Sequence, residues 1–142
     1  MFKVIERMSD FVEVPLKQVY GEAVDLTYDW HDFFRQSGAR LCLWLEGERC
    51  VSALRFEPWK DGLLVTALET APDRRRLGFA SALLEAVLDH VGQGKVYAHI
   101  HHRNAASIRV HEKCGFQKIA ETARLLDGTV TAQMGTFVVE LL

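Results

Sequence analysis

Hydrophobic and polar residues alternate along several short segments of this chain, a pattern typical of β-strands. A weak alternation over residues 1–8 predicts a first strand. Stronger runs at 40–47 and 49–56 predict a hairpin that turns at 46–48, and residues 58–62 predict the turn into the next strand. The remaining strands are predicted over residues 63–68, 95–101, 117–126 and 129–142. The dipeptide Asp127-Gly128 between the last two is a strong hairpin signal.

Two other segments have sequence patterns that predict α-helices. In the first, which starts at Gly78, apolar residues recur at helical spacing: Ala80, Leu83, Leu84, Val87, Leu88 and Val91. The second runs from Asn104, a good N-cap, to Gly115, which suits the left-handed position after a helix; Phe116 supplies the apolar contact that accompanies such a cap. Residues 9–37 are helical or irregular. This order of elements predicts a mixed α/β sheet with helices on its faces.

The turn between the strand 63–68 and the helix after Gly78 has the features of an anion site. It reads Pro72-Asp73-Arg74-Arg75-Arg76-Leu77-Gly78-Phe79-Ala80. A helix that begins at Gly78 presents unpaired N–H groups and the positive end of its dipole. The three arginines therefore indicate a phosphate or pyrophosphate, with a solvated arginine run as the alternative. The segment is neither a P-loop nor a Gly-x-Gly-x-x-Gly fingerprint.

Polar side chains share one face of each of the next two elements. Asn104, Ser107 and His111 lie at i, i+3 and i+7 and form one stripe of their helix. In the strand before it, one face holds Val96, Ala98 and Ile100, and the opposite face holds Tyr97, His99 and His101. His99 is either a functional base or a hydrogen-bonded core histidine.

The histidines of this region also raise the question of a metal. His99, His101 and His102 stand close together in the sequence, with His111 nearby. No carboxylate or thiol completes a ligand set at a recognisable spacing, so we expect no metal. His101 and His102 are then expected to be structural or surface residues.

These segments resemble the GNAT superfamily of N-acetyltransferases. Residues 75–80 are similar to that family's acetyl-CoA pyrophosphate loop, in which an Arg or Gln is followed by two residues, Gly, one residue, and Gly or Ala. Residues 104–116, which end in Gly-Phe, resemble its next segment, and one helix and one strand separate the two, as in the family. The resemblance is specific over residues 63–116 and absent from the first 38. The family usually has Tyr where this chain has His111.

The resemblance implies a single GNAT-like domain over residues 1–142, with a mixed, mostly antiparallel central sheet and helices on both faces. It implies acetyl-CoA as co-substrate, held between the strand that ends near Thr70 and the strand 97–101. The backbone around Leu68, Glu69 and Thr70 would hold the pantetheine arm and the acetyl oxygen. The pyrophosphate would lie on Arg75, Arg76, Leu77, Gly78, Phe79 and Ala80, and Asn104 and Ser107 would face the arm.

The implied activity is acetyl transfer from acetyl-CoA to a primary amine of a small molecule or peptide, by direct attack and without a metal. His111 would replace the family's tyrosine as proton donor to the departing thiolate. His99 is the leading candidate base, because some members carry a carboxylate base five residues before this asparagine. Glu69 is a second candidate, or a salt-bridged surface residue. The alternative function is a non-catalytic CoA-binding regulatory or sensor module.

Composition sets limits on the class of protein. A chain of 142 residues with 49% hydrophobic and 25% charged residues is typical of one soluble globular domain. No stretch approaches the roughly 18 apolar residues of a membrane span, and the N-terminus lacks a signal-peptide core, so we expect a cytoplasmic protein. Cys42, Cys50 and Cys114 fit neither a disulfide framework nor a metal motif, and free thiols are expected.

The net charge of −2 is unevenly distributed. Residues 10–38 carry six acids and two bases, whereas residues 71–124 carry nine bases and five acids. This asymmetry suits an anionic cofactor and a cationic acceptor, with solvated faces as the alternative. No basic stripe interleaves with aromatic residues, which disfavours nucleic acid as a partner. The sequence leaves the oligomeric state open, a homodimer included.

Overall fold

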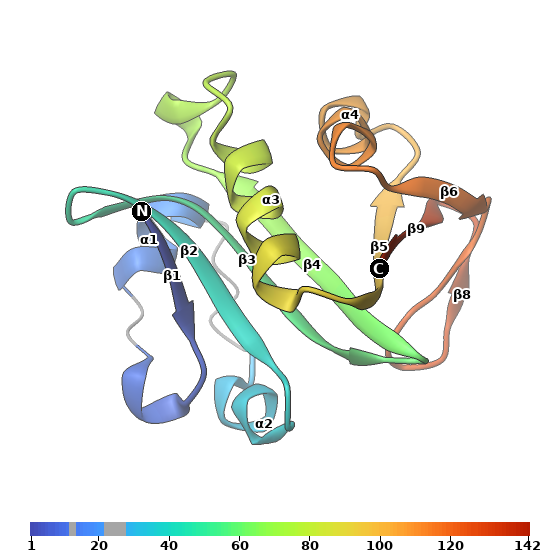
Figure 1. The fold of residues 1–142 in the computed structure, drawn as a ribbon, viewed down its shortest axis with the longest axis horizontal. Coiled ribbons are helices and arrows are strands. Elements are labelled where there is room, and N and C mark those ends of the chain that lie inside the picture. The colour runs from blue at the N-terminus through green and yellow to red at the C-terminus, as the bar shows by residue number, and fades with distance from the viewer. Residues whose placement is uncertain (12–13, 22–27) are drawn as a thin grey trace.

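The computed structural model describes residues 1–11, 14–21 and 28–142. The described residues form a seven-stranded sheet in the order β1-β2-β3-β4-β5-β9-β6 (Figure 1). Its strands are β1 (Phe2–Ile5), β2 (Arg40–Glu46), β3 (Arg49–Trp59), β4 (Gly62–Thr70), β5 (Gly94–His101), β9 (Met134–Leu141) and β6 (Gln117–Ala120). Only the β4–β5 pair among them is parallel. The predicted mixed, mostly antiparallel sheet is confirmed.

Helices cover both faces of this sheet, as the sequence predicts. On one face, α1 (Val14–Tyr20) and α2 (Trp30–Arg35) pack near the N-terminal strands, and on the other lie α3 (Phe79–Val91) and α4 (Ala105–Lys113). The alternation along β2 shows the two layers, because Leu41 and Leu43 join the first core and Cys42 joins the second. Among the connections that the structure describes are the short 3₁₀ turns η1 (Met8–Asp10) and η3 (Pro72–Arg74). No helix in the described ranges is long and apolar enough to cross a bilayer.

The larger core lies under α3. The apolar stripe predicted for this helix is confirmed, since it buries Leu83, Leu84, Val87 and Leu88. Val96, Ala98 and Ile100 of β5 belong to the same core, which confirms the predicted faces of that strand. Tyr97, His99 and His101 consequently point to the opposite face of the sheet.

The parallel strands β4 and β5 pair over only part of their length. Gly62–Val65 pair with Lys95–Ala98, and beyond these residues the two strands separate (Figure 1). The β3–β4 register shifts at the same level, and Ala67 has a φ of +57°, in the left-handed region that alanine rarely adopts. This bulge turns the end of β4 away from β5. The end of β4 stays paired with β3 and the end of β5 with β9, while the edges that face each other are unpaired within the described sheet.

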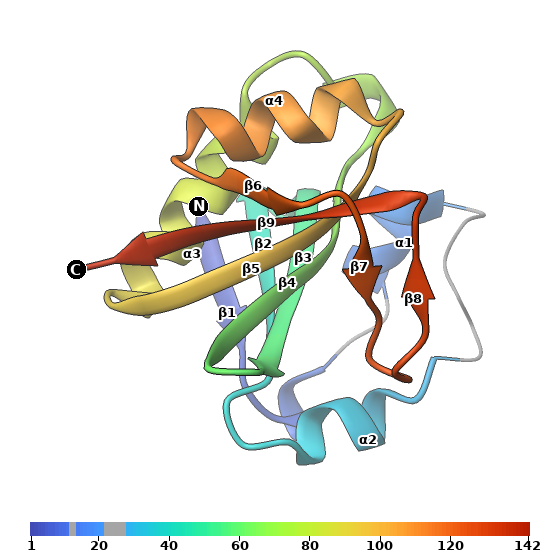
Figure 2. The ribbon, with the colours of Figure 1, turned by 90° about the vertical axis from the view of Figure 1, so that its right-hand side faces the viewer.

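The C-terminal strands differ from the prediction. Asp127-Gly128 does form the expected turn, with the Asp127 carboxylate accepting a hydrogen bond from Thr129 N (2.8 Å). Each predicted long strand, however, is broken in two: β6 is followed by β7 (Ala123–Arg124), and β8 (Val130–Thr131) precedes β9. A register shift between Lys118 and Ala120 interrupts the β6–β9 ladder, and β7 and β8 form a separate two-stranded ladder (Figure 2).

The predicted turn at residues 58–62 is shorter in the structure. The strand β3 continues through Pro58 to Trp59, and only Lys60 and Asp61 turn the chain into β4. The last residue of β3 that pairs with β2 is Phe56. Pro58 lies beyond it, so its missing N–H interrupts no hydrogen bond between β2 and β3.

Candidate active site

The N-terminus of α3 is built around Gly78. This residue has a φ of +87°, which glycine adopts without strain. The first helical hydrogen bond runs from Ala82 N to Gly78 O (3.0 Å), so the amides before Ala82 have no partner within the helix. A Cβ added at Gly78 would meet no atom within 4 Å, which shows that space remains beside this backbone. The turn has the open, amide-rich geometry of an anion site.

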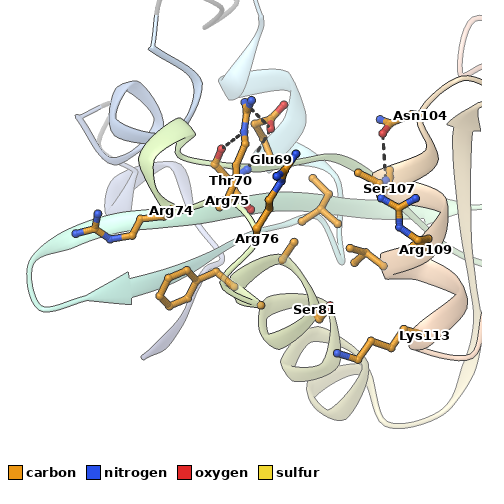
Figure 3. A pocket seen from close by; sticks show the side chains of 16 residues that line it. Glu69, Thr70, Arg74, Arg75, Arg76, Ser81, Asn104, Ser107, Arg109 and Lys113 are labelled. Atoms are coloured by element: carbon orange, nitrogen blue, oxygen red, sulfur yellow. Dashed lines mark hydrogen bonds and ion pairs between the residues drawn. The ribbon is translucent and has the colours of Figure 1, made fainter.

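A cavity of about 680 Å³ lies between this turn and α4 (Figure 3). All predicted cofactor-binding residues except Leu77 line it: Leu68, Glu69, Thr70, Arg75, Arg76, Gly78, Phe79, Ala80, Asn104 and Ser107. The Leu77 side chain is 64% exposed and does not line the cavity. Segments that lie far apart in the sequence are therefore brought together in one cavity, and their binding roles remain predictions.

Two of the three consecutive arginines already have acidic partners. Arg74 pairs with Glu46 (3.0 Å) and Asp73 (3.0 Å). Arg75 pairs with Glu69 (3.3 Å), and its Nε donates to Thr70 O (3.3 Å). The proposed alternative for Glu69, a salt-bridged residue, is thus present in the structure, and its role as a base remains a prediction.

Three other cations of the cavity have no such partner. Arg76, Arg109 and Lys113 take part in no ion pair within the described part of the chain, and all three line the cavity (Figure 3). Arg109 and Lys113 were not among the cofactor-binding residues predicted from the sequence. Their spacing of four residues, which places both side chains on one side of α4, was the available signal. These uncommitted charges favour an anionic ligand with more than one charged group.

The beginning of α4 matches its predicted cap. The Asn104 side-chain oxygen Oδ1 accepts a hydrogen bond from Ser107 N (3.1 Å), and both side chains face the cavity (Figure 3). Gly115 at the other end has a φ of +96°, and Phe116 N donates to His111 O (3.0 Å). These local hydrogen bonds define where α4 begins and where it ends.

His111 does not follow Asn104 and Ser107 into the cavity. Its side chain is 3% exposed, its Nδ1–H donates to Ser107 O (2.7 Å), and its ring meets the Phe116 ring edge-on at 5.0 Å. Burial lowers the pKa of the His111 imidazole, and the hydrogen bond to Ser107 O opposes this shift. The ring is absent from the cavity lining, and its role as proton donor remains a prediction.

His99 also lies outside the cofactor cavity, on the opposite face of the sheet from α3. Its ring contacts Trp59 edge-on at 4.8 Å, and its Nε2 is buried and has no hydrogen-bond partner within residues 1–11, 14–21 and 28–142. Burial, assisted by the positive charge of Lys60, lowers the pKa of His99. A neutral imidazole with a free nitrogen is the form that a general base requires.

The neighbouring histidines have local structural contacts. His101 Nδ1 accepts a hydrogen bond from Arg103 N (3.1 Å), and His102 Nε2 donates to Glu121 O (2.9 Å). Within the described ranges, no three histidine, cysteine or acidic side chains come together in a position to hold a metal ion. Cys42, Cys50 and Cys114 are free thiols.

The acidic side chains of residues 10–38 that the structure describes make contacts with nearby residues. Asp10 pairs with Arg7 (3.3 Å), and Asp32 lies 3.8 Å from Arg35. The Asp29 carboxylate caps α2 by accepting a hydrogen bond from Asp32 N (2.9 Å). The remaining acids, Glu13, Glu22 and Asp25, lie outside the described residues. The expected preference for a cationic acceptor therefore remains a prediction.

Two histidines with lowered pKa values, the buried His111 and the half-buried His99, predict a loss of stability in mild acid. Because the pKa values of His99 and His111 are lowered in the folded protein, the unfolded chain binds more protons below about pH 6.5. The free energy of unfolding should therefore fall between about pH 7.5 and about pH 5, above the range where aspartates titrate. Thermal unfolding across this range measures it, and a His99→Gln, His111→Phe double variant should show a flatter dependence. An equally steep curve in that variant would contradict the assignment.

Comparison with known proteins identifies the class. The model of the acetyltransferase (GNAT) family matches residues 5–116, and the chain belongs to this family. No curated protein matches the sequence.

Solved structures share the fold at low sequence identity. An IAA acetyltransferase from Bacillus cereus is 12% identical over 99% of each chain, with a TM-score of 0.72. The structure of yncA from Salmonella typhimurium with its cofactor acetyl-CoA is 18% identical over 100% of this chain and 95% of that chain, with a TM-score of 0.70. The ribosomal-protein-S18-alanine N-acetyltransferase from Escherichia coli is 16% identical over 99% and 93%, with a TM-score of 0.63. At these identities the likeness shows the fold alone.

Proposed function

We propose that this protein is an N-acetyltransferase that moves the acetyl group of acetyl-CoA to a primary amine of a small molecule or peptide. The observation that carries the proposal is the cavity between α3 and α4, where free helix amides meet three uncommitted cations. Membership of the acetyltransferase family supports it. We further propose that residues 1–142 act as one domain; the cytoplasmic location remains a prediction.

The donors of the cavity suit the charged parts of acetyl-CoA. The amides after Gly78, with Arg75 and Arg76, are suited to the pyrophosphate, and Arg109 and Lys113 offer charge for a further phosphate. Residues 68–70 of β4 have no strand partner on the β5 side, and we propose that their backbone groups bind the pantetheine arm and the acetyl oxygen. Thr70 N and Thr70 O would exchange their present contacts with the Glu69 and Arg75 side chains for the ligand. Arg75 would exchange part of its contact with Glu69 for the ligand.

The proposed transfer is a direct attack. The neutral amine forms a bond to the thioester carbonyl carbon, the carbon–sulfur bond breaks, and the CoA sulfur leaves as a thiolate that takes up a proton. We propose His99 as the group that accepts the proton of the amine, with Glu69 as the second candidate. His111 is proposed as the source of the thiolate's proton, with water as the alternative.

A binding module without catalysis is the second candidate function. The substitution of the family's usual tyrosine by His111 favours it, and so does the position of that ring outside the cavity. Such a module would bind acetyl-CoA and leave the thioester intact.

One experiment separates the two functions. The purified protein is incubated with acetyl-CoA and a panel of small amines and peptides, and thiol release and product mass are recorded. We expect amine-dependent release of CoA thiol and an acetylated product. Tight binding of acetyl-CoA in calorimetry without turnover on any amine would reject the enzyme and support the binding module. An absence of both binding and turnover would reject both functions.

A further inference from the structure

Three polar residues from three neighbouring strands form a row across the sheet. Arg55 of β3 pairs directly with Thr66 of β4. Thr66 and His99 each follow the last pair of the β4–β5 ladder, Val65 with Ala98. Val65 and Ala98 point into the core under α3, so Thr66 and His99 point to the opposite face, where Arg55 also lies. We call these three residues the polar row.

Each member of the polar row has a buried polar atom that lacks a hydrogen-bond partner among the described residues. These atoms are Arg55 Nε, Thr66 Oγ1 and His99 Nε2, and no other side-chain atom in the described part of the chain is in this state. Buried polar atoms in native proteins are nearly always hydrogen-bonded, and exceptions require an explanation. Three exceptions side by side indicate a place where a polar ligand completes the hydrogen bonds.

The charge of the polar row indicates the kind of ligand. Arg55 is half-buried and takes part in no ion pair of the described residues; its guanidinium lies 4.2 Å from the centre of the Tyr28 ring. The nearest acid along the strand on the same face, Glu57, is buried and accepts a hydrogen bond from Gln36 instead (2.8 Å). A half-buried guanidinium without a counterion is unfavourable, and its planar donors match a carboxylate. The polar row thus favours an anionic group, in contrast to the cationic acceptor that the acidic residues 10–38 suggested.

The polar row lies beside the proposed acetyl site. Directly after Thr66, the Ala67 carbonyl accepts a hydrogen bond from the Tyr20 hydroxyl of α1, and β4 then continues to Leu68, which lines the cofactor cavity. The Tyr20 hydroxyl fixes the bulge at which β4 leaves β5. A molecule held by Thr66 and His99 is therefore only a few residues along β4 from the backbone proposed to hold the acetyl oxygen.

We propose that the polar row is the acceptor subsite, and that the acceptor is a small molecule with a carboxylate near its primary amine. This inference rests on the proposed function. Arg55 and Thr66 donate hydrogen bonds to the carboxylate, and His99 Nε2 faces the amine. As the nitrogen–carbon bond forms and the carbon–sulfur bond of acetyl-CoA breaks, the amine's proton passes to His99 Nε2, and the thiolate takes a proton from solvent or from the enzyme.

Matched acceptor pairs test the proposal. Free amino acids and their α-amides differ only in whether the group beside the amine is a carboxylate or a neutral carboxamide. We expect wild-type kcat/KM, measured by thiol release, to favour the acids by about tenfold to a hundredfold, the range expected for hydrogen bonds to a charged group. Arg55→Met should remove most of this preference by lowering kcat/KM for the acids, and Thr66→Val should remove part of it.

Two comparisons isolate the effect. Because the amine of an amide is less basic, the acid-to-amide ratio is compared between variants rather than read from wild type alone. Arg35→Gln, at an exposed arginine that lies 3.8 Å from Asp32, removes one positive charge elsewhere and should leave the ratio unchanged. Arg55→Lys keeps the charge without the planar fork and should keep only part of the preference; it also serves if Arg55→Met does not fold.

The experiment distinguishes a failure of the acceptor subsite from a failure of the proposed acetyltransferase function. If acetyl-CoA binds with wild-type affinity to Arg55→Met in calorimetry while the acid preference is lost, the subsite is supported. An unchanged ratio in Arg55→Met or Arg55→Lys, or a wild-type preference for amides or for amines without a carboxylate, would overturn the inference and leave the acetyltransferase proposal intact. An absence of acetyl-CoA turnover with every amine would reject the proposed function itself.

Discussion

Replacing Gly78 by aspartate should weaken acetyl-CoA binding by at least about a hundredfold while the protein stays folded, because bringing like charges together costs several kcal/mol. The carboxylate would stand among the free amides at the start of α3, where the pyrophosphate is proposed to bind. The fold should tolerate the change, since a Cβ at this position meets no atom within 4 Å. Calorimetry with acetyl-CoA measures the affinity, and circular dichroism checks the fold.

Gly78→Ala is the matched control. Both variants place a Cβ at a residue whose φ is +87°, which costs roughly 1–2 kcal/mol of conformational energy for an L-residue. Only aspartate adds a negative charge. Because aspartate adopts a left-handed backbone more readily than alanine, we expect alanine to lower the melting temperature at least as much as aspartate and to retain a larger share of the affinity. Wild-type affinity in a folded Gly78→Asp protein would show that the pyrophosphate does not bind at this turn.

Replacing His111 by phenylalanine should lower kcat by about 10²–10⁴-fold if this histidine donates the proton to the thiolate, the range typical of a lost general acid. The lowered pKa of His111 adds a pH signature. Its protonated form is lost as the pH rises past a value below about 6.5, so kcat should already decline above that pH. His111→Tyr restores a donor with a pKa near 10 and should move the decline to higher pH.

The structural role of His111 predicts a different pattern. The imidazole Nδ1–H satisfies Ser107 O, and phenylalanine would leave that carbonyl without this partner. In that case, His111→Phe should lower the melting temperature while kcat and its pH dependence stay close to wild type. Such a result would remove His111 from the mechanism and leave proton donation to water.

The helix ends, the turn before Gly78 and the buried face of α3 could be predicted from the sequence, because each depends on residues that are close together in the chain. Asn104 and Gly115 mark the ends of α4 through hydrogen bonds and a φ of +96° that involve only nearby residues. The turn before Gly78 was recognisable for the same reason. The apolar period of α3 predicted its buried side, because a 3.6-residue repeat fixes which residues share a face.

The break of the C-terminal strands and the bulge in β4 were not predictable in the same way. Ala67 has a left-handed backbone although alanine gives no sign of it, and its carbonyl is held by Tyr20, 47 residues away in the sequence. The short β7–β8 ladder results from a register shift against β9. Each depends on pairing between distant segments, which no local pattern encodes.

The sequence by itself determined which segments form helices and strands, and which faces of the two helices are buried or polar. It also showed the turn at Gly78 as a candidate anion site. The resemblance to an acetyltransferase family was visible in the sequence too, and the match of the family model to residues 5–116 confirmed it. Only the tertiary structure decided which charges are free. It showed that Arg75 is paired with Glu69, whereas Arg76 takes part in no ion pair of the residues that the structure describes, and that the His111 ring lies outside the cavity. It alone aligned Arg55 with Thr66 and His99. The reason is that partners, burial and register arise from contacts between strands distant in sequence, whereas caps and periodicity arise within a few residues.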